Sequence, residues 1–303
     1  LRVKACSLNY HDIFTRNGMP GIKLALPVIP GLDVAGEIAE VGPDVTDWKV
    51  GDRVLVDPLN RVEGGLQGET YNGGLAEYCK TRAHQLVRIP DGVTYAQAAS
   101  LPVAYGTAHR MMFTNGNIKA GEKALILGAS GGVGTGALLL AKMVGMEVLA
   151  AGSSESKLAR LTEMGADHVV DYSKQEFHKK VYELFGKPHR RSFDGGVAVV
   201  VNFTGGETWV PSLRSLKRGG RLVTCGSTTG ITAEINLMQL FQQQYRIFGS
   251  FGCAIHNVAE GLAKMAEGVR PVIDTAITLD QIEEGLARLE SRKVFGKIVM
   301  TLG

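Results

Sequence analysis

The pattern of hydrophobic and polar residues changes near Ala96. Up to that point, short β-branched runs such as VLVD (54–57) are separated by turns rich in Gly and Pro. This pattern predicts an irregular all-β unit. Beyond it, continuous apolar runs of strand length alternate with stretches of helical spacing. Such alternation predicts a parallel sheet that is covered by helices on both faces and built from right-handed crossovers.

The second region repeats a unit of one strand and one helix. In Lys123–Gly145, an apolar run leads through a Gly-rich turn into a helix of small residues. Four further units follow, and RIFGSFG (246–252) is expected to be the last strand of that sheet. The chain then returns to helix (257–267), strand, helix and strand.

Composition narrows the class of protein. The 303 residues, 45% of them hydrophobic, suffice for one large domain or two ordinary ones. The 33 basic and 30 acidic side chains leave a net charge of +3 without a long basic run, which gives no reason to expect a nucleic acid or a membrane as partner. The four cysteines form no CxxC pair, so we expect a reduced, cytoplasmic protein in which Cys6 is a core residue.

The Gly-rich turn is the strongest chemical signal in the chain. Ala129–Gly134 occupies the frame GxGxxG, with Ala in place of the first Gly. Gly131 lacks a Cβ that would block a pyrophosphate, and Gly134 lets the helix pack close to the strand. The amides of four residues at the helix N-terminus are the expected ligands of the pyrophosphate: Ser130, Gly131, Gly132 and Val133. The alternative is a tight turn that packing alone requires.

The end of the second strand of the parallel sheet indicates which nucleotide binds. NAD-binding proteins usually place an acidic residue there, about 20 residues after the motif, to bind the ribose 2′-hydroxyl. Here the strand ends at Gly152, followed by Ser153, Ser154 and then Lys157. Hydroxyls and a cation can bind a 2′-phosphate, so Ser153 and Lys157 predict NADPH. The alternative is that Lys157 is an ordinary exposed helix residue.

Segments along the whole chain resemble the medium-chain dehydrogenase/reductase superfamily, and within it the zinc-free quinone oxidoreductase branch. The resemblance rests on KACSLNYHD, PGLDVAGEIAEVGPDVTDWKVGDRV, GGLAEYC, LPVAYGTAH, GASGGVG and VFGKIVM. It implies an α/β protein with a GroES-like catalytic domain (1–95), a Rossmann NADP-binding domain (96–267) and a return to the catalytic domain (268–303). Because the chain starts at Leu1 without Met, N-terminal strands of the catalytic domain can be missing.

The same resemblance implies that a metal site has been lost. Three catalytic zinc ligands of the zinc-dependent relatives match Asn9, Leu32 and Val103 in this sequence. Leu and Val cannot donate an electron pair to zinc. The loop that carries four cysteines around a structural zinc in those relatives matches 57–74, which contains no Cys. We therefore expect no bound metal.

The resemblance also assigns candidate catalytic residues. Asn9 would donate a hydrogen bond to the substrate oxygen, or else it is a turn residue after a strand. His11 lies where zinc-dependent relatives carry a proton-relay hydroxyl, so it is either a proton donor or a structural histidine. Thr107 matches a threonine near the nicotinamide, or else it is a helix-interior residue.

Further cofactor contacts are expected at the ends of strands. Tyr172 matches an aromatic residue that borders the adenosine phosphate in NADPH-binding relatives. Gly226 and Ser227 in the turn CGST, and Phe251 in the turn GSFG, follow strands at the edge where such sheets bind ligands. Each of these turns can equally be a plain loop.

Metal-free chemistry restricts the reaction. Without a Lewis acid nothing lowers the pKa of an alcohol, whereas an already polarised acceptor can take a hydride. The sequence thus predicts NADPH-dependent reduction of a quinone or of an α,β-unsaturated carbonyl (enone, enal or enoyl compound). The alternatives are a nucleotide-binding structural or interaction protein of crystallin type, and a zinc-dependent alcohol dehydrogenase whose ligands are absent. By analogy with relatives, RIFGSFG is expected to pair two chains in a homodimer, with a tetramer as alternative.

Overall fold

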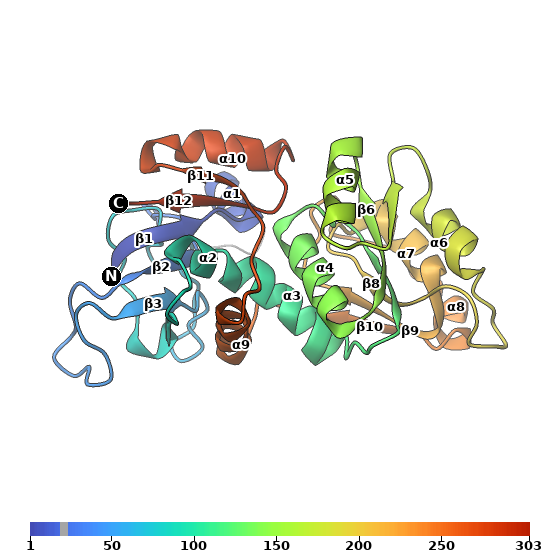
Figure 1. Cartoon of the computed structure of the whole chain (residues 1–303), viewed down its shortest axis with the longest axis horizontal. Helices are drawn as coiled ribbons and strands as arrows, with labels where there is room; N and C mark the ends of the chain where they lie inside the picture. The colour runs from blue at the N-terminus through green and yellow to red at the C-terminus, as the bar shows by residue number, and fades with distance from the viewer. Residues whose placement is uncertain (19–23) are drawn as a thin grey trace. The chain divides into compact units, whose positions relative to one another are not determined.

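The computed structural model describes residues 1–18 and 24–303, which form two compact units. The first comprises 1–106 and 252–303, and the second comprises 107–251 (Figure 1). The first unit therefore extends beyond the expected limit at residue 95 and resumes before residue 268. The cause is packing, because the helical residues on both sides of the second unit pack with the sheet and helices of the first.

The first unit contains a six-stranded sheet in the order β11-β12-β1-β2-β3-β4. Its strands are β1 (Arg2–Ser7), β2 (Asp33–Glu37), β3 (Arg53–Val56), β4 (Leu86–Arg88), β11 (Ile273–Ile277) and β12 (Lys297–Thr301). β12 lies antiparallel to β1, with Cys6 opposite Met300, so the end of the chain lies beside its beginning. The core on this sheet includes Cys6, as expected.

Helices of the first unit pack on this sheet or on one another. They are α1 (Tyr10–Asn17), α2 (Tyr95–Ala99), the π-helical segment η2 (Leu101–Gly106), α9 (Ile255–Ala266) and α10 (Ile282–Glu290), with short 3₁₀ turns η1 (Ala83–Gln85) and η5 (Leu279–Gln281). α9 packs against η2, where Cys253 Sγ lies 3.2 Å from the Pro102 carbonyl oxygen. A Cβ at Gly106 would lie 2.9 Å from Cys253 Sγ, which is closer than real Cβ contacts. Glycine at 106 therefore allows this close approach.

The second unit is built on a parallel sheet in the order β10-β9-β8-β5-β6-β7, which confirms the predicted Rossmann-type fold. The strands are β5 (Lys123–Ile126), β6 (Glu147–Gly152), β7 (His168–Asp171), β8 (Val197–Val201), β9 (Leu216–Thr224) and β10 (Arg246–Gly249). Every residue of β8, sequence VAVVV, is buried, as a parallel strand covered on both faces requires.

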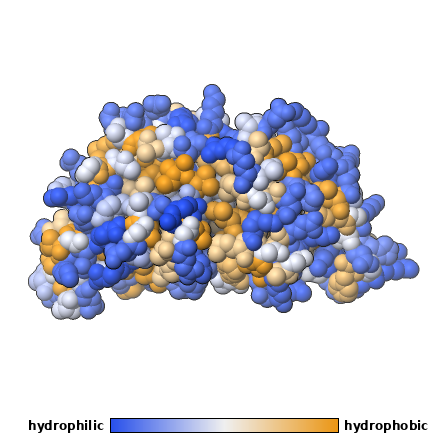
Figure 2. Space-filling view, viewed as in Figure 1, coloured by the Kyte–Doolittle hydropathy of each residue, from blue (hydrophilic) through white to orange (hydrophobic). Residues whose placement is uncertain are grey.

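Helices connect these strands. They are α3 (Thr107–His109), the π-helical segment η3 (Arg110–Asn115), α4 (Gly132–Val144), α5 (Glu155–Glu163), α6 (Phe177–Phe185), the 3₁₀ turn η4 (Gly206–Thr208), α7 (Trp209–Ser215) and α8 (Leu237–Gln242). Figure 2 shows hydrophilic residues over the outer faces of α5 and α10, as expected for amphipathic helices that bury only one face. In the part of the chain that the structure describes, no helix is long and apolar enough to cross a bilayer.

Candidate active site

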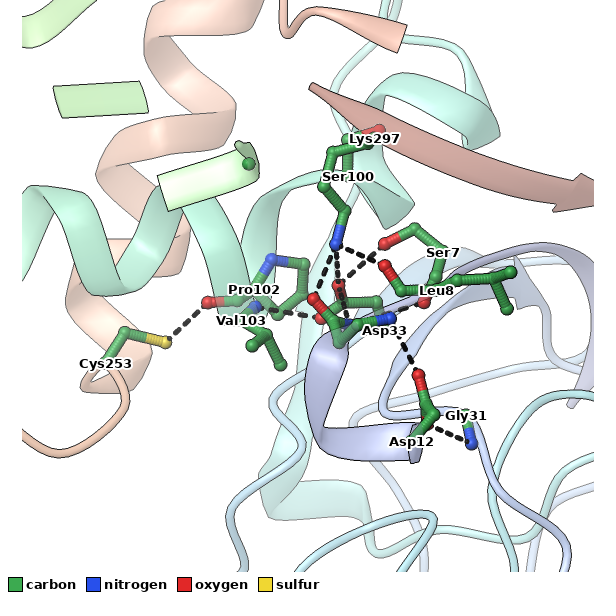
Figure 3. A network of polar contacts seen from close by, with 12 residues as sticks. Ser7, Leu8, Asp12, Gly31, Asp33, Ser100, Pro102, Val103, Cys253 and Lys297 are labelled. Carbon is green, nitrogen blue, oxygen red and sulfur yellow. Dashed lines mark hydrogen bonds and ion pairs between the residues drawn. The ribbon is translucent and has the colours of Figure 1, made fainter. Parts of the chain in front are cut away.

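A buried carboxylate, Asp33, is the centre of a polar network in the first unit (Figure 3). Asp33 is the first residue of β2 and is fully buried. Its Oδ2 accepts hydrogen bonds from Ser7 Oγ and from Asn9 Nδ2, both at 2.7 Å. Its Oδ1 accepts a hydrogen bond from the Val103 amide at 2.8 Å. The carboxylate thus joins the end of β1, the start of β2 and the segment η2.

Lys297, the first residue of β12, supplies the positive charge of this network. Its side chain is almost completely buried, and Nζ lies 3.4 Å from Asp33 Oδ2. The ammonium also donates to the Leu8 carbonyl oxygen at 2.8 Å and to Asn9 Oδ1 at 2.5 Å. A buried ammonium is costly unless its charge and its hydrogens are all satisfied, and three acceptors satisfy this one. Sequence reasoning missed Lys297, although a single lysine at the start of the apolar run KIVM was a usable signal.

Asn9 belongs to the network rather than projecting from it. Its Nδ2 donates to Asp33 Oδ2 at 2.7 Å and to the Ser7 carbonyl oxygen at 3.3 Å, and its Oδ1 accepts from Lys297. Both amide hydrogens therefore already have acceptors inside the protein. The geometry favours a bridging role for Asn9 over the expected hydrogen bond to a substrate oxygen.

A second carboxylate, Asp12, is buried beside the network. Its Oδ2 accepts from the Asn9 amide at 2.7 Å, at the start of α1, and its Oδ1 accepts from the Gly31 amide at 2.9 Å. Burial raises the pKa of Asp12 to about 6, while the two amide hydrogen bonds act in the opposite direction. Burial also raises the pKa of the Cys6 thiol well above its usual value, so Cys6 is an unreactive core residue.

His11 pairs with a residue that sequence reasoning did not single out. His11 Nε2 lies 2.6 Å from Glu69 Oε2, and both side chains are partly buried. Glu69 lies 58 residues away along the chain, so no local pattern could have indicated the pair. Thr107, the third predicted catalytic residue, is buried at the start of α3 in the second unit.

The three positions that match zinc ligands in relatives do not form a metal site. Leu32 is buried and apolar. The Val103 backbone amide and the Asn9 side-chain amide both donate to Asp33. Across residues 1–18 and 24–303, no group of three His, Cys, Asp or Glu side chains is placed to hold a metal ion. The side chains at these positions therefore do not fit zinc.

In the second unit, the Gly-rich turn combines close packing of its helix with open space at one glycine. The turn runs from β5 to α4, and Gly134 lies so close to the turn that a Cβ there would lie 2.3 Å from the Gly128 oxygen. Glycine at 134 is therefore required for α4 to approach the turn. A Cβ at Gly131 would meet nothing closer than 3.5 Å, so its absence leaves open space on the turn.

The amides of this turn are divided between two tasks. The Gly131 amide donates to the Gly128 oxygen at 3.0 Å and closes the turn. The residues that follow begin the 13-residue helix α4, whose first amides have no intrahelical acceptor. The amides of Ser130, Gly132 and Val133 could therefore hold a pyrophosphate. Gly131 would contribute open space, because its own amide is already bonded within the turn.

The ends of β6 and β7 carry the residues predicted to select the nucleotide. Ser153 is exposed directly after β6, and Ser154 caps α5 by accepting from the Lys157 amide at 3.4 Å. Tyr172 is 44% exposed and its amide donates to the Gly152 oxygen at 3.1 Å, so the ring and the serines follow neighbouring strands. The residues directly after β6 carry hydroxyls, and Asp171 on β7 lies opposite Gly152, the last residue of β6.

The loop after β8 is organised by Asn202, which sequence reasoning missed. Asn202 is fully buried, and its Oδ1 accepts from the Thr204 amide at 2.9 Å and from the Gly205 amide at 3.2 Å. This loop lies beside the Gly-rich turn, because a Cβ at Gly128 would lie 3.0 Å from the Phe203 ring. β5 and β8 are neighbours where the strand order reverses, which is where such sheets bind ligands.

The remaining predicted contacts follow β9 and β10. Gly226 is exposed and Ser227 is partly exposed in the turn after β9. Phe251 follows β10, is 72% exposed and accepts a hydrogen bond at its carbonyl oxygen from Arg110 Nη1 at 3.0 Å. Their roles toward a cofactor remain predictions.

Comparison with known proteins identifies the family. The family model described as "Alcohol dehydrogenase GroES-like domain" matches residues 1–91, and the one described as "Zinc-binding dehydrogenase" matches residues 132–267. Quinone oxidoreductase-like protein 2 of Bos taurus is 30% identical over 314 residues, which cover all of this chain and 84% of the relative.

Solved structures agree with this family. An NAD-dependent alcohol dehydrogenase matches with a TM-score of 0.91 and 30% identity, covering all of this chain and 91% of the other. The 2-octenoyl-CoA carboxylase reductase CinF, solved with NADP and 2-octenoyl-CoA, matches with a TM-score of 0.87 and 26% identity, covering 99% of this chain and 78% of the other.

The fold and the nucleotide turn thus define an oxidoreductase of the kind that uses a nicotinamide cofactor. The chain belongs to the medium-chain dehydrogenase/reductase superfamily, in its quinone oxidoreductase-like branch.

Removing the ammonium of Lys297 is predicted to destabilise the first unit. Lys297→Met leaves Asp33 buried without its charge partner and leaves Leu8 and Asn9 oxygens without a donor. We expect the free energy of unfolding in urea to fall by about 3–5 kcal/mol. Lys293→Met, at an exposed position shortly before β12, is the matched control and should change stability by less than about 0.5 kcal/mol. Equal stability of the two variants would contradict the role given to the network.

Proposed function

We propose that the protein is an NADPH-dependent oxidoreductase that reduces a quinone or an α,β-unsaturated carbonyl compound without a metal. The observation that carries the proposal is the replacement of zinc-binding positions by a satisfied polar network. Leu32 and Val103 have no donor side chain, and the Lys297 ammonium lies in contact with Asn9. A divalent cation bound near Asn9 would be repelled by that ammonium in a region of low dielectric constant.

Metal-free chemistry favours an acceptor that is already polarised. The bound cofactor supplies a hydride. When the acceptor is conjugated to a carbonyl, the negative charge of the product delocalises onto oxygen without a Lewis acid. The chain then needs to orient the two reactants and to supply a proton, and the turn at 130–133 would fix the pyrophosphate for this purpose.

Names of relatives support the same classes of acceptor. The Bos taurus relative is named quinone oxidoreductase-like, and CinF was solved with NADP and an unsaturated acyl-CoA. The free cysteines of the described residues fit a reduced, cytoplasmic setting, in which a small-molecule acceptor is the expected partner.

NADPH oxidation with a panel of quinones, enals, enones and enoyl thioesters tests the proposal. We expect turnover with at least one acceptor class, no loss of rate in a chelator, and no zinc by elemental analysis. NADPH binding without turnover of any acceptor would instead favour a crystallin-type binding protein. Alcohol oxidation with one bound zinc per chain would contradict the metal-free reaction.

The cofactor preference depends on the end of β6. Ser153→Asp places a carboxylate where a 2′-phosphate is expected, so the Kd for NADPH should rise roughly 10-fold or more, while that for NADH should not rise, because the carboxylate can accept from the ribose 2′-hydroxyl. Thr162→Asp adds the same charge at the far end of α5 and should change neither affinity. Calorimetric titration measures both constants, and tighter binding of NADH than of NADPH by the unmodified protein would overturn the proposal.

A homodimer through the second unit is the proposed assembly. Within the described part of the chain, β10 pairs only with β9, which leaves one edge of the sheet open. The preceding segment, 231–241, exposes apolar side chains that a soluble monomer rarely gathers: Ile231 (78%), Leu237 (71%), Met238 (62%) and Phe241 (68%). The open edge of β10 can pair with the same strand of a second copy, and the apolar segment beside it in sequence can be buried in that contact.

Charged residues in this segment should therefore weaken the dimer. We expect the double variant Leu237→Glu with Phe241→Glu to sediment as a monomer at concentrations where the unmodified protein is a dimer. Val62→Glu, at a 74% exposed apolar residue of the first unit, is the control and should leave the dimer intact. An unmodified protein that sediments as a monomer at all concentrations would refute the proposed assembly.

A further inference from the structure

His11 and Glu69 form a close pair outside the Asp33 network. His11 is the second residue of α1, and its Nε2 lies 2.6 Å from Glu69 Oε2. The side chains are 27% and 19% exposed, so the pair is shielded from solvent more than ordinary surface pairs are. A carboxylate in this position keeps a hydrogen on Nε2 and fixes the orientation of the ring.

The loop that carries Glu69 is held against the start of α1. Gly68 has a φ of +76°, and its amide donates to the Tyr71 oxygen at 2.8 Å. A Cβ at Gly68 would lie 2.8 Å from the Gly31 nitrogen, so the loop packs directly on Gly31. The Gly31 amide in turn donates to Asp12, the residue after His11. Glu69 and His11 are therefore brought together by backbone packing, and not by two long side chains meeting in solvent.

Other charged groups around α1 are engaged elsewhere. Asp12 accepts from backbone amides, and Arg16 pairs with Glu283 and Glu290 on α10. The Phe14 ring meets the His11 ring edge-on, with centroids 6.4 Å apart. Over residues 1–18 and 24–303, Glu69 is the charged group in contact with the imidazole, and Nδ1 has no hydrogen-bond partner.

We propose that Glu69 is a positioning residue that fixes the His11 ring so that Nδ1 delivers the proton in the proposed reduction. The inference rests on the proposed function. Hydride addition to the β-carbon moves the electron pair of the C=C bond into a new double bond between the α-carbon and the carbonyl carbon, and the π pair of the C=O bond moves onto the oxygen. The resulting enolate then takes the proton from Nδ1 of the imidazolium, which becomes a neutral imidazole with its hydrogen on Nε2 facing Glu69. Water returns the proton to Nδ1 before the next turnover.

Kinetics of three variants test whether Glu69 acts through His11. His11→Gln removes the proton donor and should lower kcat by about 100-fold or more, within the range for general acid catalysis. Glu69→Gln keeps the size and polarity of the side chain and should lower kcat by about 10-fold, with the KM for NADPH within about twofold. The double variant should be no slower than His11→Gln alone, because Glu69 has nothing left to position. Glu63→Gln, which breaks the exposed Arg82–Glu63 pair of the same region, should leave kcat unchanged.

Isotope effects identify the affected step. In Glu69→Gln the solvent deuterium effect on kcat should increase, and the effect of deuterium at C4 of NADPH should shrink, because proton delivery becomes slower. Additive losses in the double variant, or unchanged isotope effects, would show a merely structural role and overturn the inference while leaving the proposed function intact. Absence of turnover in the unmodified protein would overturn both.

A measurement without cofactor or substrate tests the pair itself. Nitrogen-15 NMR of the histidine-labelled protein, recorded at a pH high enough for every exposed histidine to be neutral, should show a single tautomer of His11 with hydrogen on Nε2. In Glu69→Gln, whose amide can also donate to the ring, both tautomers should be populated. A mixture of tautomers in the unmodified protein would refute the positioning role.

Discussion

The ion pair between Asp33 and Lys297 is the interaction on which the first unit depends. The two residues are 264 positions apart, and their contact joins the last strand of the chain to its second. A buried ion pair is stable only when its electrostatic attraction and hydrogen bonds offset the free energy of desolvating both charges. Here Ser7, Asn9 and the Val103 amide satisfy the carboxylate, and main-chain and amide oxygens satisfy the ammonium.

The same network joins three segments of the first unit. Asn9 and the Val103 amide converge on Asp33, which directly follows Leu32 in the chain. A polar cross-link of this kind positions the chain but supplies no Lewis acid, which is why the proposed chemistry needs a polarised acceptor and a separate source of protons.

In the second unit, close packing holds the Gly-rich turn and the loop after β8 in place. Gly134 allows α4 to lie against the turn, and Asn202 ties down the next loop at the point where the strand order reverses. Phe203 lies against Gly128, so the two loops constrain each other. The nucleotide turn is therefore preorganised by the sheet, and the first amides of α4 have no acceptor within the helix.

Sequence alone determined the parallel sheet, the nucleotide turn and the lack of donor side chains at Leu32 and Val103, because periodicity, glycine spacing and residue chemistry are local properties. Tertiary structure decided the rest. Apolar spacing in η2 and α9 predicts helices but not which sheet they pack on, so both boundaries of the second unit differ from the expected ones. Three features depend on residues that are distant along the chain and that only the folded backbone brings together. They are the direction of the Asn9 amide, the burial of Lys297 and the pairing of His11 with Glu69.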